Sequence, residues 1–548
     1  MPRSWRLTAI LVFVLVTLSG GLAGGRLLAL GDDLRLRLRA YTDLIAAART
    51  NAGTEVTHRD LVFASIQGML RGLDPHSNFL TPTAYTTMRE RQQGSFYGLG
   101  ILVGVRNGQL TVISPMEGMP AARLGIRAGD VISAIEGEPT APLSLDEAVQ
   151  RLKGPKGSQV RITIVRRGLD EPLELTVTRA EIPQTTVRYA YLIAPGTGYL
   201  SIGDFTRSTA GEVARALAEL RAAGMQRLLL DLRNNGGGLL DQAIEVADQL
   251  LPAGATIVET RGRVRDSEQT YTASRQATKL DLPLIVLVNG GTASAAEILA
   301  GAIQDHDLGL VLGTPTWGKG LVQTVYNLSY GSGLALTTAK YYTPSGRLIQ
   351  RDYSSYWDYY TRAEDEEPDE AADPAAGETR PRREEGEAYA TDLGRTVYGG
   401  GGITPDIEVE LDELPEYVQF LFARNAFFNF ALEILRRQPE GIAPDWRPAP
   451  ELVDEFGRWL VEQEIDDAED VERGLEPAAS RAVILRQVRS EVLTSRHGLQ
   501  AAHAALAEGD AQIRAALGQF DQAAELLTRR AAAIAAAGER PTPSRRRP

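Results

Sequence analysis

Cysteine is absent from this chain of 548 residues, and histidine occurs only five times. Without cysteine there is no disulfide bond, no thiol nucleophile and no thiolate-ligated metal. The histidines form no HExxH or similar cluster, so we expect no metal and no cofactor. The net charge of −13 argues against general nucleic-acid binding. A nucleophile in this chain has to be something other than a thiol.

The N-terminus is typical of an export segment. Arg3 and Arg6 precede an uncharged stretch from Leu7 to Gly25, whose length lies between a signal-peptide core and a full membrane span. Because there is no Ala-x-Ala cleavage site, we expect an uncleaved single-pass anchor, with a cleaved signal near Ala23 as the alternative. Both place the protein outside the cytoplasm, in the periplasm or cell envelope, and the anchor would hold it to the inner membrane.

A serine lies where a buried strand is expected to turn into a helix. Leu284–Val288 is a short apolar run, and the segment from Ala293 to Asp305 has a helical composition. Ser294 therefore falls at the helix N-terminus, where unpaired N–H groups favour negative charge. The N–H of Ala295 is a candidate donor to an oxyanion beside the serine.

A serine hydroxyl needs a base, and Lys319 is the candidate. It follows an expected strand at Leu308–Leu312 and lies in a Trp-Gly-Lys-Gly loop. Burial can lower the pKa of a lysine far enough for its neutral amine to act as a base. Gln323, four residues later, is placed to orient that amine. The plainer alternatives are that Ser294 only caps the helix and that Lys319 is a solvated loop charge.

A second loop supports the catalytic interpretation. The apolar strand that begins at Arg227 ends in Arg-Asn-Asn-Gly-Gly-Gly, and a helix is expected from Leu239 to Leu250. Consecutive glycines let backbone N–H groups approach a ligand closely. Taken alone this is a plain strand-to-helix turn, but beside a serine and a lysine it offers Gly237 or Gly238 as a second oxyanion donor. We select Gly238.

Four motifs together resemble the carboxyl-terminal processing, or tail-specific, serine proteases. They are Leu-Asp-Leu-Arg-Asn-Asn-Gly-Gly-Gly, Val-Asn-Gly-Gly-Thr-Ala-Ser-Ala-Ala-Glu, Gly-Thr-Pro-Thr-Trp-Gly-Lys-Gly-Leu-Val-Gln and Gly-Ile-Thr-Pro-Asp. The resemblance covers about residues 55 to 410. It implies a crotonase-like α/β fold, with Ser294 as nucleophile, Lys319 as general base and Gln323 as its orienter. Leu-Asp-Pro-His-Ser also occurs in the family, and we expect His76 in it to shape a turn.

Gly94-Ser-Phe-Tyr-Gly-Leu-Gly-Ile101 precedes an alternating strand, and residues 120–132 run from a short helix into a turn and a strand. This segment resembles a PDZ domain. The resemblance implies binding of an extended C-terminal peptide by addition to a sheet edge, with a glycine-rich loop holding the terminal carboxylate. A helix expected from Leu143 to Lys153 would line the groove. The alternative is a small β-rich domain that only packs on the enzyme. The predicted peptide-binding residues are Tyr97, Gly98, Leu99, Gly100, Ile101, Ala148 and Leu152.

The chain is too long for one core, and 43% hydrophobic residues suffice for three or more domains. We expect an α/β, crotonase-like protease core with an inserted PDZ domain, an N-terminal helical segment and a C-terminal helical region. The C-terminal helices could pack on the core, dimerise or bind an adaptor. The expected segments are an anchor or signal at 1–30, helices at 31–92, the PDZ domain at 93–180, the protease core at 181–410 with a disordered acidic insertion at 363–387, and helices at 411–548.

The sequence therefore predicts an exported serine endopeptidase that captures protein C-terminal tails and cleaves through an acyl-enzyme. Its expected partners are proteins or peptides with accessible C-terminal tails, and the membrane through its N-terminal segment. Two alternatives stay open: a non-catalytic PDZ scaffold on a degenerate enzyme fold, and a crotonase-like acyl-transfer enzyme. The second would need a coenzyme A site and no peptide groove.

Overall fold

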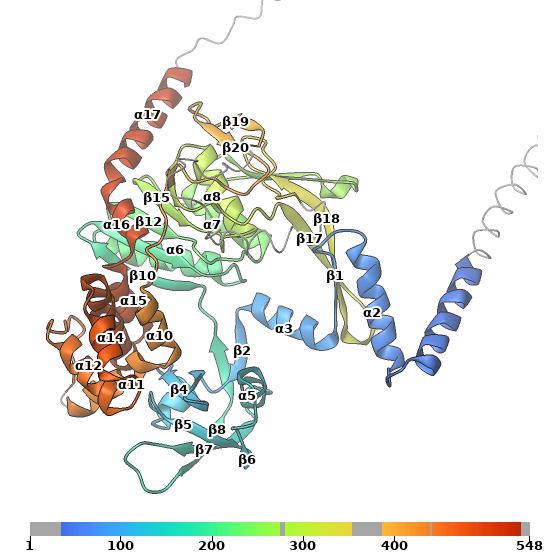
Figure 1. Ribbon diagram of the computed structural model, residues 1–548. Helices are drawn as coiled ribbons and strands as arrows, with labels where there is room; N and C mark the ends of the chain where they lie inside the picture. Colours follow the sequence, from blue (N-terminus) through green and yellow to red (C-terminus); the bar gives the residue numbers. More distant parts are fainter. Residues whose placement is uncertain (1–33, 275–279, 353–385, 439–440, 539–548) are drawn as a thin grey trace, which may run out of the picture. The chain divides into compact units, whose positions relative to one another are not determined.

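The computed structural model describes residues 34–274, 280–352, 386–438 and 441–538 (Figure 1). The expected segment 1–30 lies outside these residues, as does the insertion 363–387 apart from its last two residues. Within the described residues, no helix combines the length and apolar character that a membrane span needs. Contacts divide the chain into two compact units, Met1–Thr83 with Gln323–Thr337 and Ala84–Val322 with Thr338–Pro548.

The first unit contains helices and a small antiparallel sheet. Residues 34–51 are helical, and α2 (His58–Arg71) begins at Thr57, whose side chain accepts the N–H of Asp60. Strand β1 (Asn78–Leu80) interrupts the helical region that the sequence predicted, because it pairs with the first residues of β18 (Gly333–Tyr342). β17 (Leu321–Asn327) also pairs with β18.

The expected turn around His76 is confirmed within this unit. Asp74 accepts the N–H groups of His76 at 2.8 Å and Ser77 at 2.7 Å, and also the Ser77 hydroxyl at 2.6 Å. These hydrogen bonds lower the pKa of Asp74, although burial opposes them. A carboxylate that binds the backbone just after it is a common way to close a turn.

A six-stranded sheet forms the centre of the second unit. Its first two strands are antiparallel and all later neighbours are parallel. The parallel strands are short and apolar, as expected for strands covered on both faces. In spatial order they are β10 (Val187–Ala194), β11 (Thr197–Ile202), β12 (Arg227–Asp231), β15 (Leu284–Val288), β16 (Leu310–Gly313) and β21 (Ile407–Glu408).

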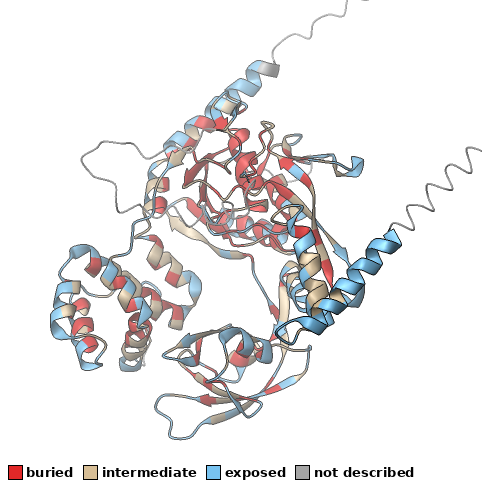
Figure 2. Ribbon diagram, turned by 45° about the vertical axis from the view of Figure 1, so that its right-hand side comes forward, coloured by how far each residue is buried: buried red, intermediate tan, exposed pale blue. Residues whose placement is uncertain are grey.

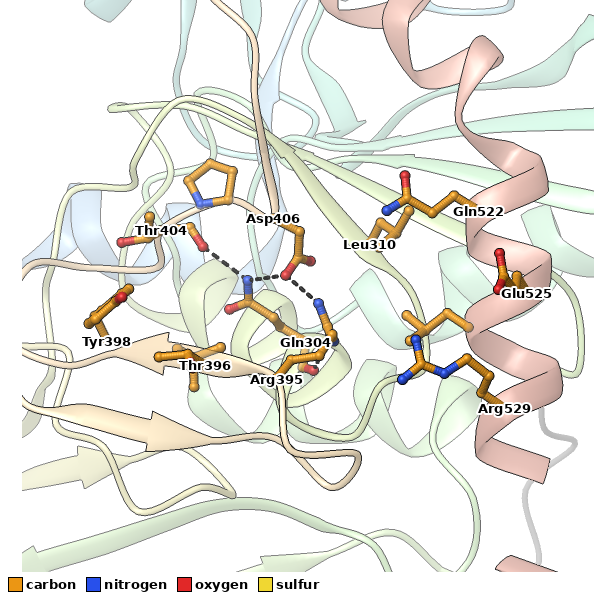
Figure 3. Close-up of a pocket in the computed structure, with 13 residues that line it drawn as sticks. Gln304, Leu310, Arg395, Thr396, Tyr398, Thr404, Asp406, Gln522, Glu525 and Arg529 are labelled. Atoms are coloured by element: carbon orange, nitrogen blue, oxygen red, sulfur yellow. Dashed lines mark hydrogen bonds and ion pairs between the residues drawn. The ribbon is translucent and has the colours of Figure 1, made fainter. Parts of the chain in front are cut away.

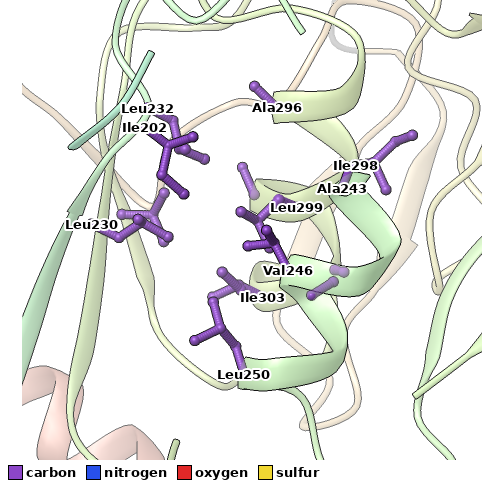
Figure 4. Packing of buried hydrophobic residues seen from close by; sticks show 14 of the residues in the cluster. Ile202, Leu230, Leu232, Ala243, Val246, Leu250, Ala296, Ile298, Leu299 and Ile303 are labelled. Atoms are coloured by element: carbon purple, nitrogen blue, oxygen red, sulfur yellow. The ribbon is translucent and has the colours of Figure 1, made fainter. Parts of the chain in front are cut away.

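Alternate side chains of these strands enter two different hydrophobic cores. Leu228 and Leu230 lie in one core with α6 (Thr209–Ala222), α7 (Leu240–Leu250) and α8 (Ala295–Asp305), as Figure 4 shows for part of the cluster. Side chains two residues apart share a face. Figure 2 shows the buried positions concentrated in this region.

The opposite face of the sheet is covered by C-terminal helices. Leu229 lies in the second core, with Phe520 and Leu526 from the end of the chain. The helices involved are α16 (Ala511–Gly518) and α17 (Phe520–Gly538). Of the three roles that the sequence left open for this region, packing on the core is therefore confirmed.

A separate small sheet contains β3 (Ile101–Arg106) at one edge. Helix α5 (Leu145–Leu152) begins with a capping box in which Ser144 and Glu147 bind each other's backbone N–H. Strand β2 (Ser95–Gly98) pairs with β9 (Ala180–Pro183) outside this sheet. The other elements are β4 (Gln109–Pro115), α4 (Pro120–Arg123), β5 (Val131–Ile135), β6 (Glu138–Pro139), β7 (Gln159–Val165) and β8 (Leu173–Thr178).

The remaining described elements complete the second unit. Four buried aromatic rings, Phe427, Phe430, Phe456 and Trp459, pack together in a helical bundle near the C-terminus.

Mixed sheets with helices, a small sheet domain and a helical C-terminal region confirm the predicted fold class. The elements are α3 (Pro82–Gln93), β13 (Thr256–Gly262), β14 (Gln269–Thr272), β19 (Ala388–Ala390), β20 (Thr396–Tyr398), α10 (Glu416–Ala423), α11 (Ala426–Arg437), α12 (Leu452–Glu462), α13 (Ala468–Leu475), α14 (Ala478–His497) and α15 (Leu499–Ala507).

Candidate active site

Ser294 lies in a strained backbone conformation between β15 and α8. Its φ of 57° and ψ of −117° correspond to the first central residue of a type II′ turn, a position that favours glycine. A non-glycine residue held there costs of the order of 1–3 kcal/mol. An ordinary helix cap has an extended backbone. Ser294 occupies the N-cap position of α8, but the plain capping interpretation does not explain its conformation.

A buried carboxylate joins the serine turn to the lysine loop. Glu297 is fully buried in the first turn of α8. One carboxylate oxygen accepts the N–H of Ser294 at 2.7 Å and the N–H of Lys319 at 2.9 Å. The other accepts the Thr316 hydroxyl at 2.5 Å and the N–H of Gly318 at 2.7 Å. Ser294 and Lys319 are therefore brought together around one side chain.

Our sequence interpretation assigned no role to Glu297. The signal was available, because Ser-x-x-Glu before a helix is the pattern of a capping box. In the structure, this glutamate does bind the N–H of Ser294 as a capping box requires. The pattern alone does not say that the same carboxylate also binds a loop more than twenty residues later.

Burial changes the acidity of both charged groups in this site. It raises the pKa of Glu297 to about 7, against the hydrogen bonds that favour the ionised form. Burial also lowers the pKa of Lys319, while the nearby charge of Glu297 acts in the opposite direction. A lysine that acts as the base requires a pKa lowered by burial, and the direction and cause found here agree with that requirement.

Tyr341 bridges the same two segments from β18. Its hydroxyl lies 3.0 Å from the carbonyl oxygen of Ser294 and also contacts the carbonyl oxygen of Lys319. The ring is almost fully buried. Backbone atoms of the serine and lysine segments are thus fixed by a carboxylate that accepts and a hydroxyl that donates.

The triglycine loop lies against Ser294. A Cβ atom added to Gly237 would come within 2.8 Å of the Ser294 Cβ and 3.0 Å of the Ala295 nitrogen. At Gly238 it would lie 2.2 Å from the carbonyl oxygen of Phe205, and φ is +142°. Only glycine fits either position without displacing backbone.

Asn235 decides which N–H groups of this loop are available. Its side-chain oxygen accepts the N–H of Gly237 at 2.9 Å, so that donor is occupied. Its amide group donates to Ile202, and its carbonyl oxygen accepts the N–H of Ala293. Among the described residues, the N–H groups of Gly238 and Ala295 donate to no protein acceptor. These two are the predicted oxyanion donors, and their role stays a prediction.

Gln323 belongs to the first unit, where its side-chain amide donates to the carbonyl oxygen of His76 at 2.6 Å. This bond fixes the glutamine side chain, but it does not test the predicted orientation of the lysine. Sequence reasoning gave no role to the His76 carbonyl, since nothing in Leu-Asp-Pro-His-Ser points to a partner so distant in the chain.

The five predicted peptide-binding residues from 97 to 101 differ in exposure and in backbone role. Tyr97 is 39% exposed, whereas Leu99 is buried in the core of the small sheet domain. Gly98 pairs with β9, and Gly100 adopts a φ of +74° just before Ile101 begins β3. The N–H groups at 99 and 100 donate to no acceptor among the described residues.

The two predicted helix residues are placed differently from expectation. Ala148 and Leu152 are only 1% and 5% exposed and pack inside the domain core, because they share the inner face of α5. Leu145 is 37% exposed and Val149 is partly exposed. These latter two are the apolar side chains that α5 leaves open.

A cavity of about 410 Å³ lies at the other end of α8 (Figure 3). Asp406, from the Gly-Ile-Thr-Pro-Asp motif, accepts the N–H of Val311 at 2.8 Å and the Gln304 amide at 3.1 Å, and it pairs with Arg395. Burial raises the pKa of Asp406, although Arg395 opposes this. The motif therefore anchors the chain beside β16, and Ser294 does not line this cavity.

Comparison with known proteins agrees with this geometry. The model of peptidase family S41 matches residues 196–354, and a PDZ domain model matches residues 111–166. A carboxy-terminal-processing protease of Bartonella bacilliformis is 40% identical over 318 residues, 57% of this chain and 73% of that protein. A carboxyl-terminal-processing protease of Synechocystis sp. is 41% identical over 301 residues, 54% of this chain and 70% of that protein.

Among solved structures, a photosystem II D1 C-terminal processing protease is 34% identical to this chain, with a TM-score of 0.33. The match covers 55% of this chain and 82% of the chain of that protease. The two curated relatives are matched over more than two thirds of their length. The region that the family model matches, residues 196–354, includes the serine, lysine and triglycine segments described above. The chain therefore belongs to peptidase family S41, as a serine-type peptidase of the carboxyl-terminal processing group that carries a PDZ domain.

Proposed function

We propose that this protein is an exported endopeptidase that binds protein C-terminal tails and cleaves them through a Ser294–Lys319 dyad. The single observation that carries the dyad is the shared carboxylate of Glu297, which binds the N–H groups of a strained serine and of a partly buried lysine. Strain at a residue often marks a functional site. A lysine with a lowered pKa is a suitable general base.

The proposed reaction proceeds in two steps. The Ser294 hydroxyl attacks the peptide carbonyl carbon while the neutral Lys319 amine takes its proton. The tetrahedral intermediate collapses, the amine product leaves with the proton returned by Lys319, and an ester on Ser294 remains. Water then attacks this ester with Lys319 again as the base, which releases the acid product and restores the hydroxyl.

Three other groups support the dyad in this proposal. The N–H groups of Ala295 and Gly238 stabilise the oxyanion in both steps, since both are left without a protein acceptor among the described residues. The family resemblance gives Gln323 the role of orienting the amine of Lys319. A peptidase needs no coenzyme A, and neither alternative drawn from the sequence is favoured by a specific feature of this site.

Tail recognition is proposed for the small sheet domain. β3 is an edge strand, so its outer backbone groups can pair with an extended peptide. The N–H groups at Leu99 and Gly100 have no acceptor among the described residues and would bind the terminal carboxylate. Leu145 and Val149 on α5 replace Ala148 and Leu152 as the apolar contacts to the peptide.

Export is proposed from the N-terminal segment alone. Basic Arg3 and Arg6 before the uncharged stretch from Leu7 to Gly25 favour translocation with the peptidase outside the cytoplasm. We place it in the periplasm or cell envelope, held to the inner membrane by this anchor. Alkaline phosphatase fused after residue 538 should be active in intact cells, and an inactive fusion would refute export.

Amidating the C-terminus of an unstructured peptide substrate should lower kcat/KM by about 10- to 100-fold, because a charged hydrogen-bond acceptor is lost. Cleavage of matched free-acid and amide peptides, followed by mass spectrometry of the products, measures this ratio. The same products show whether an internal peptide bond is hydrolysed, as an endopeptidase requires.

The control for tail recognition lies on the same helix. Val149→Lys should reduce the preference for the free acid, whereas Gln150→Lys adds the same charge at an exposed neighbouring position and should keep it. Equal cleavage of acid and amide by the wild type would exclude tail recognition while leaving the dyad intact.

Glu297→Gln should shift the acidic limb of the pH profile of kcat/KM to lower pH. The negative charge of Glu297 raises the pKa of Lys319, so its removal lets burial lower that pKa further. The maximal rate should also fall, by about tenfold or more, because an amide group cannot accept all four donors that the carboxylate binds.

The matched control for this shift is Glu212→Gln, which removes another buried carboxylate. Glu212 accepts hydrogen bonds from Thr186 and Ser208 and has no contact with the dyad. It should lower stability and leave the midpoint of the profile in place. A midpoint that moves to higher pH in Glu297→Gln would contradict the proposed charge interaction.

A further inference from the structure

A buried polar cluster lies on the sheet face that the C-terminal helices cover. Asp231, the last residue of β12, is 5% exposed and shares its face with Leu229. Tyr199 of β11 is fully buried, and its hydroxyl donates to the Asp231 carboxylate at 2.6 Å. Buried carboxylates need partners, and the main partner of this one is a cation.

Arg233 is that cation, and it is held from two sides. Its guanidinium donates to the Asp231 carboxylate at 2.7 Å and 3.0 Å. On the other side it donates to the Asp510 carboxylate at 2.7 Å and to the Gln512 side-chain oxygen at 3.0 Å. The Arg233 side chain is only 10% exposed. Planar, charge-assisted bonds of this kind fix geometry more tightly than neutral bonds do.

The second set of Arg233 partners, Asp510 and Gln512, comes from the C-terminal region. Asp510 is the N-cap of α16, where its other oxygen accepts the N–H of Ile513 at 3.0 Å. Gln512 is fully buried, and its amide donates to Val409. The helix that supplies Asp510 therefore cannot shift without moving the partner of Arg233.

Arg233 begins the loop that contains the proposed oxyanion donor. Its own N–H donates to Asp231 at 2.9 Å, which closes the turn out of β12. Two residues later Asn235 binds Gly237 and the residue before Ser294. Gly236–Gly238 follow directly and have no side chains with which to hold their own position. Their backbone is fixed by Arg233 and Asn235 on the side that leads into the loop, and by Phe205, which bonds Gly237 and Leu239, on the other side.

His503 of α15 completes the cluster without adding a charge. Its ring stacks on Tyr189 with centroids 4.0 Å apart, and its two nitrogens lie 3.0 Å and 3.3 Å from the hydroxyls of Tyr191 and Tyr199. Burial lowers the pKa of His503, although Asp231 opposes this. A neutral ring leaves Arg233 as the cation that Asp231 and Asp510 share.

We propose that Asp510 is a positioning residue for catalysis, which acts through Arg233 to hold the Gly236–Gly238 backbone at the oxyanion. The C-terminal helices then take part in the reaction from the far face of the sheet. This inference rests on the proposed oxyanion role of Gly238. It extends the functional part of the chain well beyond residues 196–354, which the family model matches.

Asp510→Asn is the test, because asparagine caps a helix about as well as aspartate but carries no charge. We expect kcat to fall about 10- to 100-fold, less than or similar to the loss of one oxyanion donor. KM should change less than about twofold, since the peptide-binding domain is untouched. A peptide boronic acid, which imitates the tetrahedral intermediate, should bind more weakly by the same factor as the fall in kcat.

Two further variants separate positioning from stability. Glu508 lies two residues before Asp510 and forms ion pairs with Arg447 and Arg489. Glu508→Gln removes these pairs and should leave kcat and boronate affinity unchanged. Asp510→Glu keeps the charge and should recover part of the lost kcat.

The inference is overturned if Asp510→Asn retains wild-type kcat. It is also overturned if the fall in activity only matches the fall in the amount of folded protein, while the boronate affinity of the folded molecules is unchanged. The proposed function fails separately, if the wild type hydrolyses no peptide or if Ser294→Ala remains active.

Discussion

Replacement of Ser294 by alanine is expected to abolish peptide hydrolysis, with kcat reduced on the order of 10⁴- to 10⁶-fold. The hydroxyl oxygen is the only non-hydrogen atom removed. The hydrogen bonds that shape the turn are made by backbone atoms of Ser294, which stay in place. The Ser294 N–H still donates to Glu297, and its carbonyl oxygen still faces Tyr341. Hydrolysis of an unstructured peptide, followed by mass spectrometry, measures the loss.

Ser294→Gly provides a matched control for this variant. Both substitutions remove the nucleophile, so both should be inactive. The φ of 57° is strained for alanine and allowed for glycine. We therefore expect the glycine variant to be more stable to urea than the alanine variant by about 1 kcal/mol. If alanine were the more stable of the two, strain at this turn would not be the explanation for its shape.

An acid quench of the wild-type reaction tests the covalent step directly. Acid protonates the base, so an ester on Ser294 should survive long enough for its mass to be mapped to the segment around this residue. A peptide adduct on a different side chain, or cleavage by Ser294→Ala at the wild-type rate, would exclude Ser294 as the nucleophile.

The sequence was sufficient to predict the local structure around the site. The expected strand Leu284–Val288 coincides with β15, and the expected helix to Asp305 ends where α8 ends. Short apolar runs predict buried parallel strands, because both faces of such strands are covered. Glycine runs after a strand predict a loop that approaches another backbone. These signals are local, and they placed Ser294 at a strand-to-helix turn.

The sequence could not predict contacts between segments far apart in the chain. Nothing near Glu297 indicates that its carboxylate also binds Thr316 and Gly318. Likewise, Asp510 reads as an ordinary helix cap, and its bond to Arg233 depends on how α16 packs on the sheet. Such pairs are fixed by tertiary packing, which a single sequence does not reveal.

The helix of the small sheet domain shows a different reason for failure. The sequence predicts a helix from Leu143 to Lys153, and α5 is formed within those bounds. Periodicity separates an inner from an outer face only when the direction of the core is known. The inner face of α5 contains Ala148 and Leu152. The apolar side chains left open on this helix are therefore Leu145 and Val149.

The pH dependence of the reaction is expected to follow Lys319. Burial lowers the pKa of this lysine from its ordinary value of 10.5, and only the neutral amine can take the proton of Ser294. The value of kcat/KM should therefore rise with pH through the lowered pKa and then level off. Lys319→Arg should lose more than about 10³-fold at every pH, because a guanidinium stays protonated.

Lys319→Met tests the same group through stability. In the folded state Lys319 loses its proton at a lower pH than in the unfolded chain, where the lysine stays protonated up to about pH 10.5. Between the lowered pKa and that value the unfolded state binds more protons, so wild-type stability should rise with pH across this window. Methionine does not titrate, and the variant should lose that rise in urea unfolding measured at several pH values.

The two lysine variants also distinguish Lys319 from Glu297, whose pKa is raised to about 7. Any residual hydrolysis by Lys319→Met should have no acidic limb if the lysine alone sets the profile. A limb near pH 7 that persists in this variant would assign the titration to the carboxylate, since its four hydrogen-bond donors require the ionised form. If Lys319→Met loses the acidic limb and most of its rate, and also loses the rise of stability with pH, then the amine of Lys319 is the source of both effects.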